Sequence, residues 1–68
     1  MEVLNRITLN PEVCNGRPTV RNQQLTVSQI LELLASGKSS DEILSQFPFL
    51  EREDIQACLM YAARMANF

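Results

Sequence analysis

The sequence predicts a small, mainly helical domain in which three helices follow a short N-terminal β-element. The chain has 68 residues, and 46% of them are hydrophobic, which suits one globular domain. Its first 25 residues are rich in turn formers, whereas apolar residues recur at helical spacing after residue 26. We therefore divide a single domain, 1–68, into an N-terminal arm, 1–25, and a three-helix unit, 26–68.

The arm is predicted to contain two short extended segments joined by a turn. The stretch "LNRITLN" alternates in polarity and contains β-branched residues, as a short strand does. A second extended segment is expected at 19–21. Between them, Asn15 and Gly16 tolerate a positive φ angle, and Pro18 fixes its own φ angle. The arm should therefore form a hairpin-like element.

Capping patterns mark the first two helices. Thr26 begins a capping box, and Gly37 stands where a left-handed C-cap would end the first helix. Ser39 and Glu42 repeat the capping-box spacing, and Pro48 stops the second helix. Two short helices joined by a tight glycine turn and followed by a longer helix are typical of a helix-turn-helix or related three-helix unit.

The third helix is expected from about Glu51 to about Ala66. One face of it should be buried in the core, and that face comprises Ile55, Cys58, Leu59, Ala62 and Ala66. The acids of its first turn, Glu51, Glu53 and Asp54, should complement the helix dipole, and the adjacent pair Glu53 and Asp54 should be solvated. In a DNA-binding protein these carboxylates would approach phosphates, so DNA recognition by this helix is disfavoured.

Charge is distributed unevenly, although the formal net charge is only −2. The arm is locally basic and the helical part is acidic. The candidate DNA-binding or partner-binding residues are Arg6, Arg17, Arg21 and Lys38. An arginine pairs equally well with a carboxylate or a phosphate, and hairpin arginines are often only solvated, so all three interpretations remain open.

The side of the third helix opposite its buried face is a candidate interface for a second copy or another partner. The residues assigned to it are Ala57, Met60, Tyr61, Arg64 and Met65. Methionine and tyrosine are enriched in such interfaces, and methionine adapts to a facing surface. Scattered apolar surface residues are the alternative interpretation.

Catalysis and cofactor binding are not predicted. The chain has no histidine, no paired carboxylates in an evident cleft and no glycine-rich phosphate loop. Cys14 and Cys58 are not arranged as a metal-binding pair, so we expect packing or surface thiols in a reducing cytosol. Neither a signal peptide nor an apolar run long enough to span a membrane is recognisable.

Three stretches resemble domain-of-unknown-function family 433, a group of small prokaryotic proteins of which many look like antitoxins of VapB type. They are "RITLNPEVCNGRPTVR", "ILELLASGKSSDEIL" and "FPFLEREDIQACLMYA", and the resemblance covers roughly residues 5–62. Two departures stand out. The sequence "NQQ" after Arg21 places Gln24 where the family usually has an arginine, and Glu51 stands where the family tends to have Ser or Thr as a helix cap.

This resemblance implies a homeodomain-like helical fold and a role in a type II toxin–antitoxin module. The partner would be a PIN-like ribonuclease toxin, which the antitoxin would mask, and the antitoxin would also repress their shared promoter by binding operator DNA. We expect a cytoplasmic homodimer or a complex. Two other functions stay open: a dimeric transcriptional repressor without a toxin, and a protein-only adaptor with no nucleic-acid role.

Overall fold

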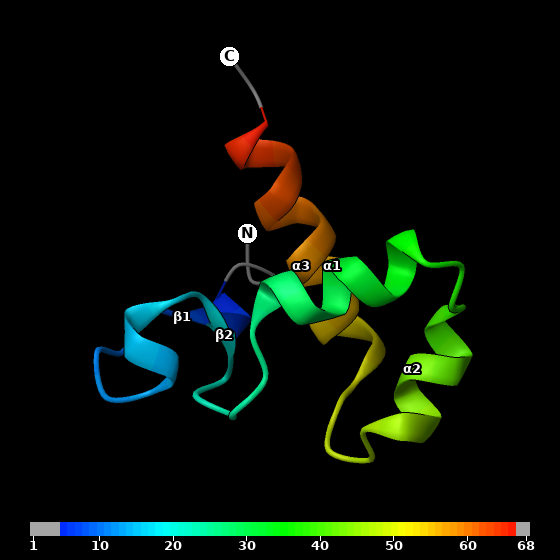
Figure 1. Cartoon of the computed structure of the whole chain (residues 1–68), viewed down its shortest axis with the longest axis horizontal. Helices are drawn as coiled ribbons and strands as arrows, with labels where there is room; N and C mark the ends of the chain where they lie inside the picture. Colours follow the sequence, from blue (N-terminus) through cyan, green and yellow to red (C-terminus); the bar gives the residue numbers. More distant parts are fainter. Residues whose placement is uncertain (1–4, 67–68) are drawn as a thin grey trace.

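Two short strands and three α-helices follow one another in residues 5–66, the part of the chain that the computed structural model describes (Figure 1). The elements are β1 (Ile7–Thr8), β2 (Thr19–Val20), α1 (Val27–Ala35), α2 (Ser40–Gln46) and α3 (Arg52–Met65). The predicted fold class, mainly helical with a short N-terminal β-element, is therefore confirmed.

The β-element is a two-stranded antiparallel ladder. Ile7 pairs with Val20, and Thr8 pairs with Thr19. The hydroxyl oxygens of the two threonines are 3.0 Å apart, which adds a side-chain hydrogen bond to the backbone pairing. Val20 is completely buried and belongs to the same core as the apolar residues of all three helices. The arm is thus packed onto the helical unit through β2.

Left-handed backbone turns follow each strand. In the loop between the strands, Asn15 has a φ angle of 58° and Gly16 one of 81°, as the sequence suggested. Directly after β2, Arg21 and Asn22 have φ angles of 48° and 60°. The prediction that the second extended segment includes Arg21 is therefore wrong. The chain has to turn there because it folds back along β2 before α1 begins.

The predicted capping interactions of α1 and α2 are present. The Thr26 hydroxyl accepts a hydrogen bond from the Gln29 N–H at 3.1 Å, and the Gln29 side chain accepts one from the Thr26 N–H at 2.8 Å. Ser39 and Glu42 make the same reciprocal pair at 3.2 and 2.8 Å. Gly37 ends α1 with a φ angle of 103°. Local sequence therefore accounts for where these two helices begin and for where α1 ends.

The core lies where α3 packs against α1, α2 and β1. Its buried apolar residues are Val20, Leu25, Val27, Ile30, Ile43, Leu50, Ile55 and Cys58. The predicted buried face of α3 is right for Ile55 and Cys58 but wrong for Leu59, which is 50% exposed, and for Ala66, which is exposed. Because α3 is covered by β1 as well as by helices, its buried arc is shifted toward Asp54 and Ala57.

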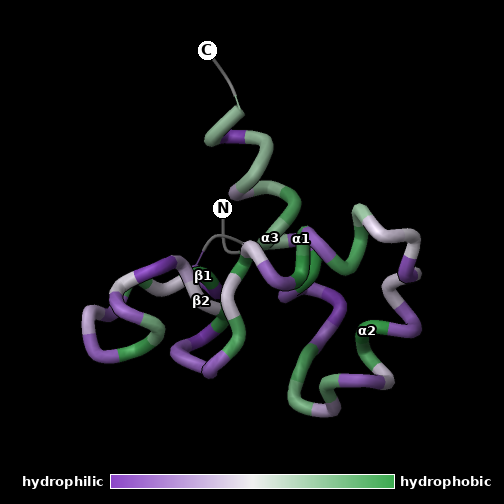
Figure 2. The backbone as a smooth tube through the Cα atoms, in the orientation of Figure 1, coloured by the Kyte–Doolittle hydropathy of each residue, from purple (hydrophilic) through white to green (hydrophobic). Residues whose placement is uncertain are grey.

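The last turns of α3 project beyond the other elements (Figure 1). They are drawn mostly in the green shades of apolar residues in Figure 2.

Within residues 5–66, none of the helices combines the length and the apolar character needed to cross a bilayer.

Candidate partner-binding site

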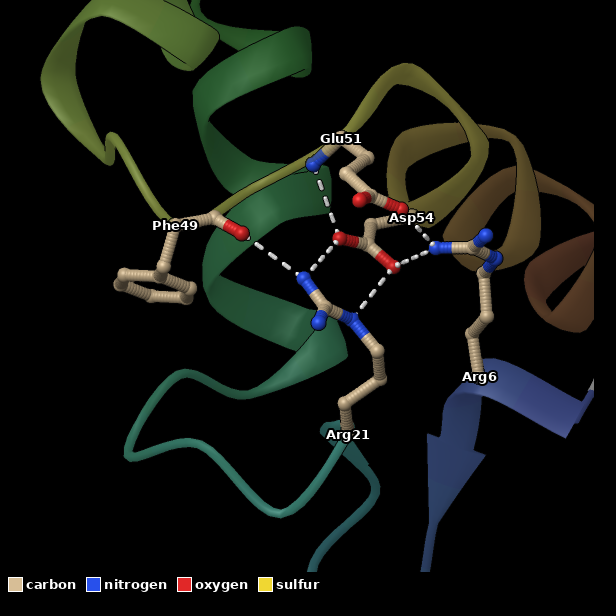
Figure 3. A network of polar contacts seen from close by, with 5 residues as sticks. All are labelled: Arg6, Arg21, Phe49, Glu51 and Asp54. Atoms are coloured by element: carbon tan, nitrogen blue, oxygen red, sulfur yellow. Dashed lines mark hydrogen bonds and ion pairs between the residues drawn. The ribbon is translucent and has the colours of Figure 1, made fainter.

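Asp54, in the first turn of α3, is a buried carboxylate whose two oxygens each accept two hydrogen bonds (Figure 3). Oδ1 accepts from Arg6 Nη1 at 2.9 Å and from Arg21 Nε at 3.0 Å. Oδ2 accepts from Arg21 Nη2 at 2.7 Å and from the Glu51 N–H at 2.9 Å. The prediction that the acids of this turn are solvated is therefore wrong for Asp54.

Arg6 and Arg21 reach Asp54 because the strand register places them opposite each other. Ile7 pairs with Val20, so the next pair in the same register is Arg6 with Arg21. The Arg21 N–H donates to the Arg6 carbonyl at 2.8 Å. Two like charges at such a position repel. Here they share the Asp54 carboxylate, while Arg6 also donates to Glu51 Oε1 at 2.6 Å and Arg21 to the Phe49 carbonyl at 2.7 Å.

The charges of this cluster stabilise one another in their ionised forms. Burial by itself raises the pKa of Asp54, but hydrogen bonds from Arg21, from the Glu51 N–H and from Arg6 outweigh it and hold that pKa below its usual value. The hydrogen bond to Glu51 raises the pKa of Arg6, and the one to Asp54 raises the pKa of Arg21. The cluster joins the β-element to the start of α3.

The four predicted basic residues therefore divide into two groups. Arg6 and Arg21 point into the protein and form ion pairs, so the prediction that Arg21 presents its charge outward is wrong. Arg17 is exposed, and its Nε donates to the Cys14 carbonyl at 3.2 Å. No carboxylate of residues 5–66 forms an ion pair with it. Lys38 is exposed in the turn between α1 and α2.

An open apolar groove of about 460 Å³ lies between the start of α1 and the end of α3. Val27 and Leu31 line it from α1, and Tyr61, Ala62 and Met65 line it from α3. Arg17 is the one charged residue among the described residues that line it. The groove thus brings together an arginine of the arm and apolar side chains of α3.

The predicted interface on α3 is only partly reproduced by this groove. Tyr61 and Met65 line it. Met60 is half-buried and Arg64 is exposed, but neither is among the residues that line the groove. Ala57 is completely buried, so its assignment to an outer face is wrong. The physical reason is that the β-element covers a side of α3 that helix packing alone would leave open.

The two cysteines have different surroundings. Burial, together with the charge of Asp54, raises the pKa of Cys58 to about 12, so this thiol keeps its proton and is a poor nucleophile. Cys14 is half-buried in the loop of the arm, and its Sγ lies 3.5 Å from Gln24 Oε1. Both thiols are free.

Sequence reasoning missed the role of Asp54. One signal was available: an antiparallel pairing of the two predicted strands can place Arg6 opposite Arg21, and two facing arginines need a shared counter-ion. The sequence does not tell which of its eight acids supplies it.

The structure defines the class of the protein: a small three-helix domain whose N-terminal β-element is joined to the third helix by partly buried ion pairs. The chain belongs to the family described as Protein of unknown function (DUF433), whose sequence model matches residues 7–62. This match covers all the strands and nearly all of α3, up to Ala62.

A protein of Sinorhizobium fredii, described as uncharacterized protein y4eO, is 30% identical over 56 residues. The aligned region covers 82% of this chain but only 25% of that relative. The chain therefore spans about a quarter of the length of the curated relative that it matches. No protein of known structure matches the chain significantly.

Proposed function

We propose that this protein is an antitoxin-like binding protein of a type II toxin–antitoxin module, which neutralises a PIN-like ribonuclease toxin in the cytoplasm. The observation that carries the proposal is the open apolar groove between α1 and α3, with Arg17 beside it. Concave apolar surfaces with a few polar groups are the usual form of binding sites, and they remain uncovered until a partner is present. The resemblance to VapB-type antitoxins supplies the kind of partner.

The distribution of charge supports a protein partner before a DNA partner. Binding to a phosphate backbone depends on several accessible cations, each of which neutralises a phosphate. Arg6 and Arg21 are instead paired with Asp54, and Arg52 at the start of α3 is paired with Asp41. Few of the basic side chains near the arm are therefore left to bind the phosphates of a shared promoter.

The same interactions favour a binding role over catalysis. Asp54 is the one buried carboxylate among residues 5–66, and both of its oxygens are engaged by hydrogen-bond donors. The pKa of Cys58 is raised to about 12 by burial, so its thiol is protonated at neutral pH. Neither group has the free, suitably poised atom that a general base or a nucleophile needs.

The test is co-expression of this protein with the product of the adjacent gene. Size-exclusion chromatography with light scattering would give the molar mass of any complex, and cleavage of a model RNA would report ribonuclease activity. We expect one complex of fixed stoichiometry in which RNA cleavage is suppressed relative to the adjacent protein alone. Separate elution of the two proteins, with undiminished cleavage, would overturn the proposal. The molar mass also shows whether the protein is a dimer.

A further inference from the structure

Resting on the proposed function, we infer that the groove between α1 and α3 binds an amphipathic helix of the partner protein, and that this helix carries a carboxylate that pairs with Arg17. The inference is based on the shape of the groove and on Arg17, the one cation among the described residues that line it.

The walls of the groove suit a helix. On α3, Tyr61 and Met65 are four residues apart, as are Ala62 and Ala66, so each pair lies on one line along the helix surface. The two alanines leave space between the larger side chains, and ridges of a second helix fit into such spaces. An amphipathic helix that lays its apolar face into a groove is one of the recurring modes of peptide recognition.

The place of the groove leaves room for a whole helix. The end of α3 projects beyond the other elements (Figure 1), so a segment in the groove can extend along it after passing Arg17 and Pro18 of the arm. The side chain at the end of the groove, Met65, is 64% exposed and is adaptable in shape. An added helix would cover it and would extend the helical layer.

Charge determines which helix fits. The protein has a net charge of −2, yet the charged residue of the groove is Arg17, and Arg64 lies on the neighbouring part of α3. The projecting end of α3 in a second copy would carry Arg64 and, among the described residues of the last turns, no carboxylate, so it would not neutralise Arg17. A helix with an acidic residue would form a charge-assisted hydrogen bond with Arg17. A single cation beside an apolar floor is a poor phosphate site.

The probes are the adjacent gene product itself and a set of overlapping 15-residue peptides that covers it, each labelled with fluorescein. Affinities come from fluorescence anisotropy. Binding is located by NMR of this protein labelled with ¹³C at the methionine methyl groups, because Met65 lines the groove and Met60 does not. We expect one peptide to bind, to shift the Met65 resonance and to leave that of Met60 in place.

Matched variants separate the groove from the rest of the surface. Arg17→Glu is compared with Lys38→Glu, which reverses an exposed charge elsewhere. Met65→Asp is compared with Leu59→Asp, a similarly exposed apolar residue of α3 outside the groove. We expect the two groove variants to weaken binding roughly tenfold or more, and the two controls to change it less than about twofold. Circular dichroism verifies that all four variants are folded.

Each outcome decides between the two proposals. If only the two groove variants lose affinity for the partner, the inference is supported. A complex that forms equally well with all four variants overturns the groove as the binding site and leaves the proposed function standing. If the adjacent protein does not bind at all, the proposed function fails and this inference fails with it. Self-association that Met65→Asp abolishes would also overturn it, because a second copy would then occupy the groove.

Discussion

The two ends of α3 differ in almost every physical respect. At its first turn, Asp54 is buried and accepts four hydrogen bonds, three of them from arginine side chains of the arm. At its last turns the helix projects from the body, and Met65 is 64% exposed (Figure 1). At the charged first turn, ion pairs with the arm stabilise the fold. At the apolar last turns, the side chain of Met65 remains accessible. Two of the four basic residues that the sequence suggested for binding, Arg6 and Arg21, thus form ion pairs within the fold instead.

Two arginines of the arm show the same contrast on a smaller scale. Arg17 and Arg21 are four residues apart and have identical chemistry. Arg21 donates to both oxygens of Asp54 and to the Phe49 carbonyl, so it is part of the fold. Arg17 is exposed beside the groove, so it is available to a partner. Substitutions at each end of α3 and in the arm, made one at a time, would test this contrast through their effects on stability.

The largest effect is expected for Asp54→Asn, which keeps the size of the side chain but removes its charge. Arg6 and Arg21 then face each other without their shared counter-ion. Breaking a fully buried pair costs about 3–5 kcal/mol, but both arginines keep contact with water, so we expect a loss of about 2 kcal/mol. Urea denaturation followed by circular dichroism measures it. Glu53→Gln changes an exposed neighbour and is the control. Equal urea midpoints for the two variants would contradict a stabilising role of Asp54.

Acidification should produce the next largest effect. The folded-state pKa of Asp54 is below its unfolded value of about 3.9, so ionised Asp54 stabilises the native state. This contribution is present at neutral pH and is lost as the pH falls below about 4 and through the folded-state pKa. We expect the free energy of unfolding to fall more steeply in this range for the native protein than for Asp54→Asn. Parallel curves would show that Asp54 does not contribute.

A smaller loss is expected for Arg21→Gln, which removes the contacts with Asp54 and Phe49. We expect about 1 kcal/mol, since the pair is partly open to water. Arg6→Gln should destabilise the protein less, because Arg21 still binds both oxygens of Asp54. Denaturant midpoints of the two variants give the order directly. The reverse order would mean that Arg6 is the principal counter-ion.

The smallest effect on stability is expected at the open end. Met65→Asp places a charge on a side chain that is already 64% exposed. We expect the free energy of unfolding to change by no more than about 0.5 kcal/mol, as for most surface substitutions. Thermal and urea denaturation both measure it. A loss as large as that of Asp54→Asn would mean that the end of α3 is packed in solution, and the contrast between the two ends would disappear.

Much of the fold was predictable because the deciding interactions are local. The capping boxes at Thr26 and Ser39 and the left-handed Gly37 involve residues within a few positions of each other. The start and the end of α3 were also predicted within one residue. The left-handed turn at Asn15 follows from a side chain that tolerates this backbone conformation.

The burial of α3 was less predictable from its periodicity. The pattern placed Leu59 inside and Ala57 outside, whereas the structure has them the other way round. A helical pattern shows which residues share a face, but the number of elements packed against the helix sets how wide the buried arc is. Here α3 meets β1 in addition to both other helices, and this widens and rotates that arc.

Sequence alone was sufficient for the fold class, the helix boundaries and the turns at Asn15 and Gly37, since each depends on contacts between near neighbours in the chain, but it missed the turn at Arg21. The roles of the arginines were decided only by tertiary structure. Asp54 lies 48 residues from Arg6 and 33 residues from Arg21, and only the strand register and the packing of α3 bring them together. Because an arginine pairs with any accessible carboxylate, its position in the folded chain, and not its identity, determines whether it stabilises the fold or faces a partner.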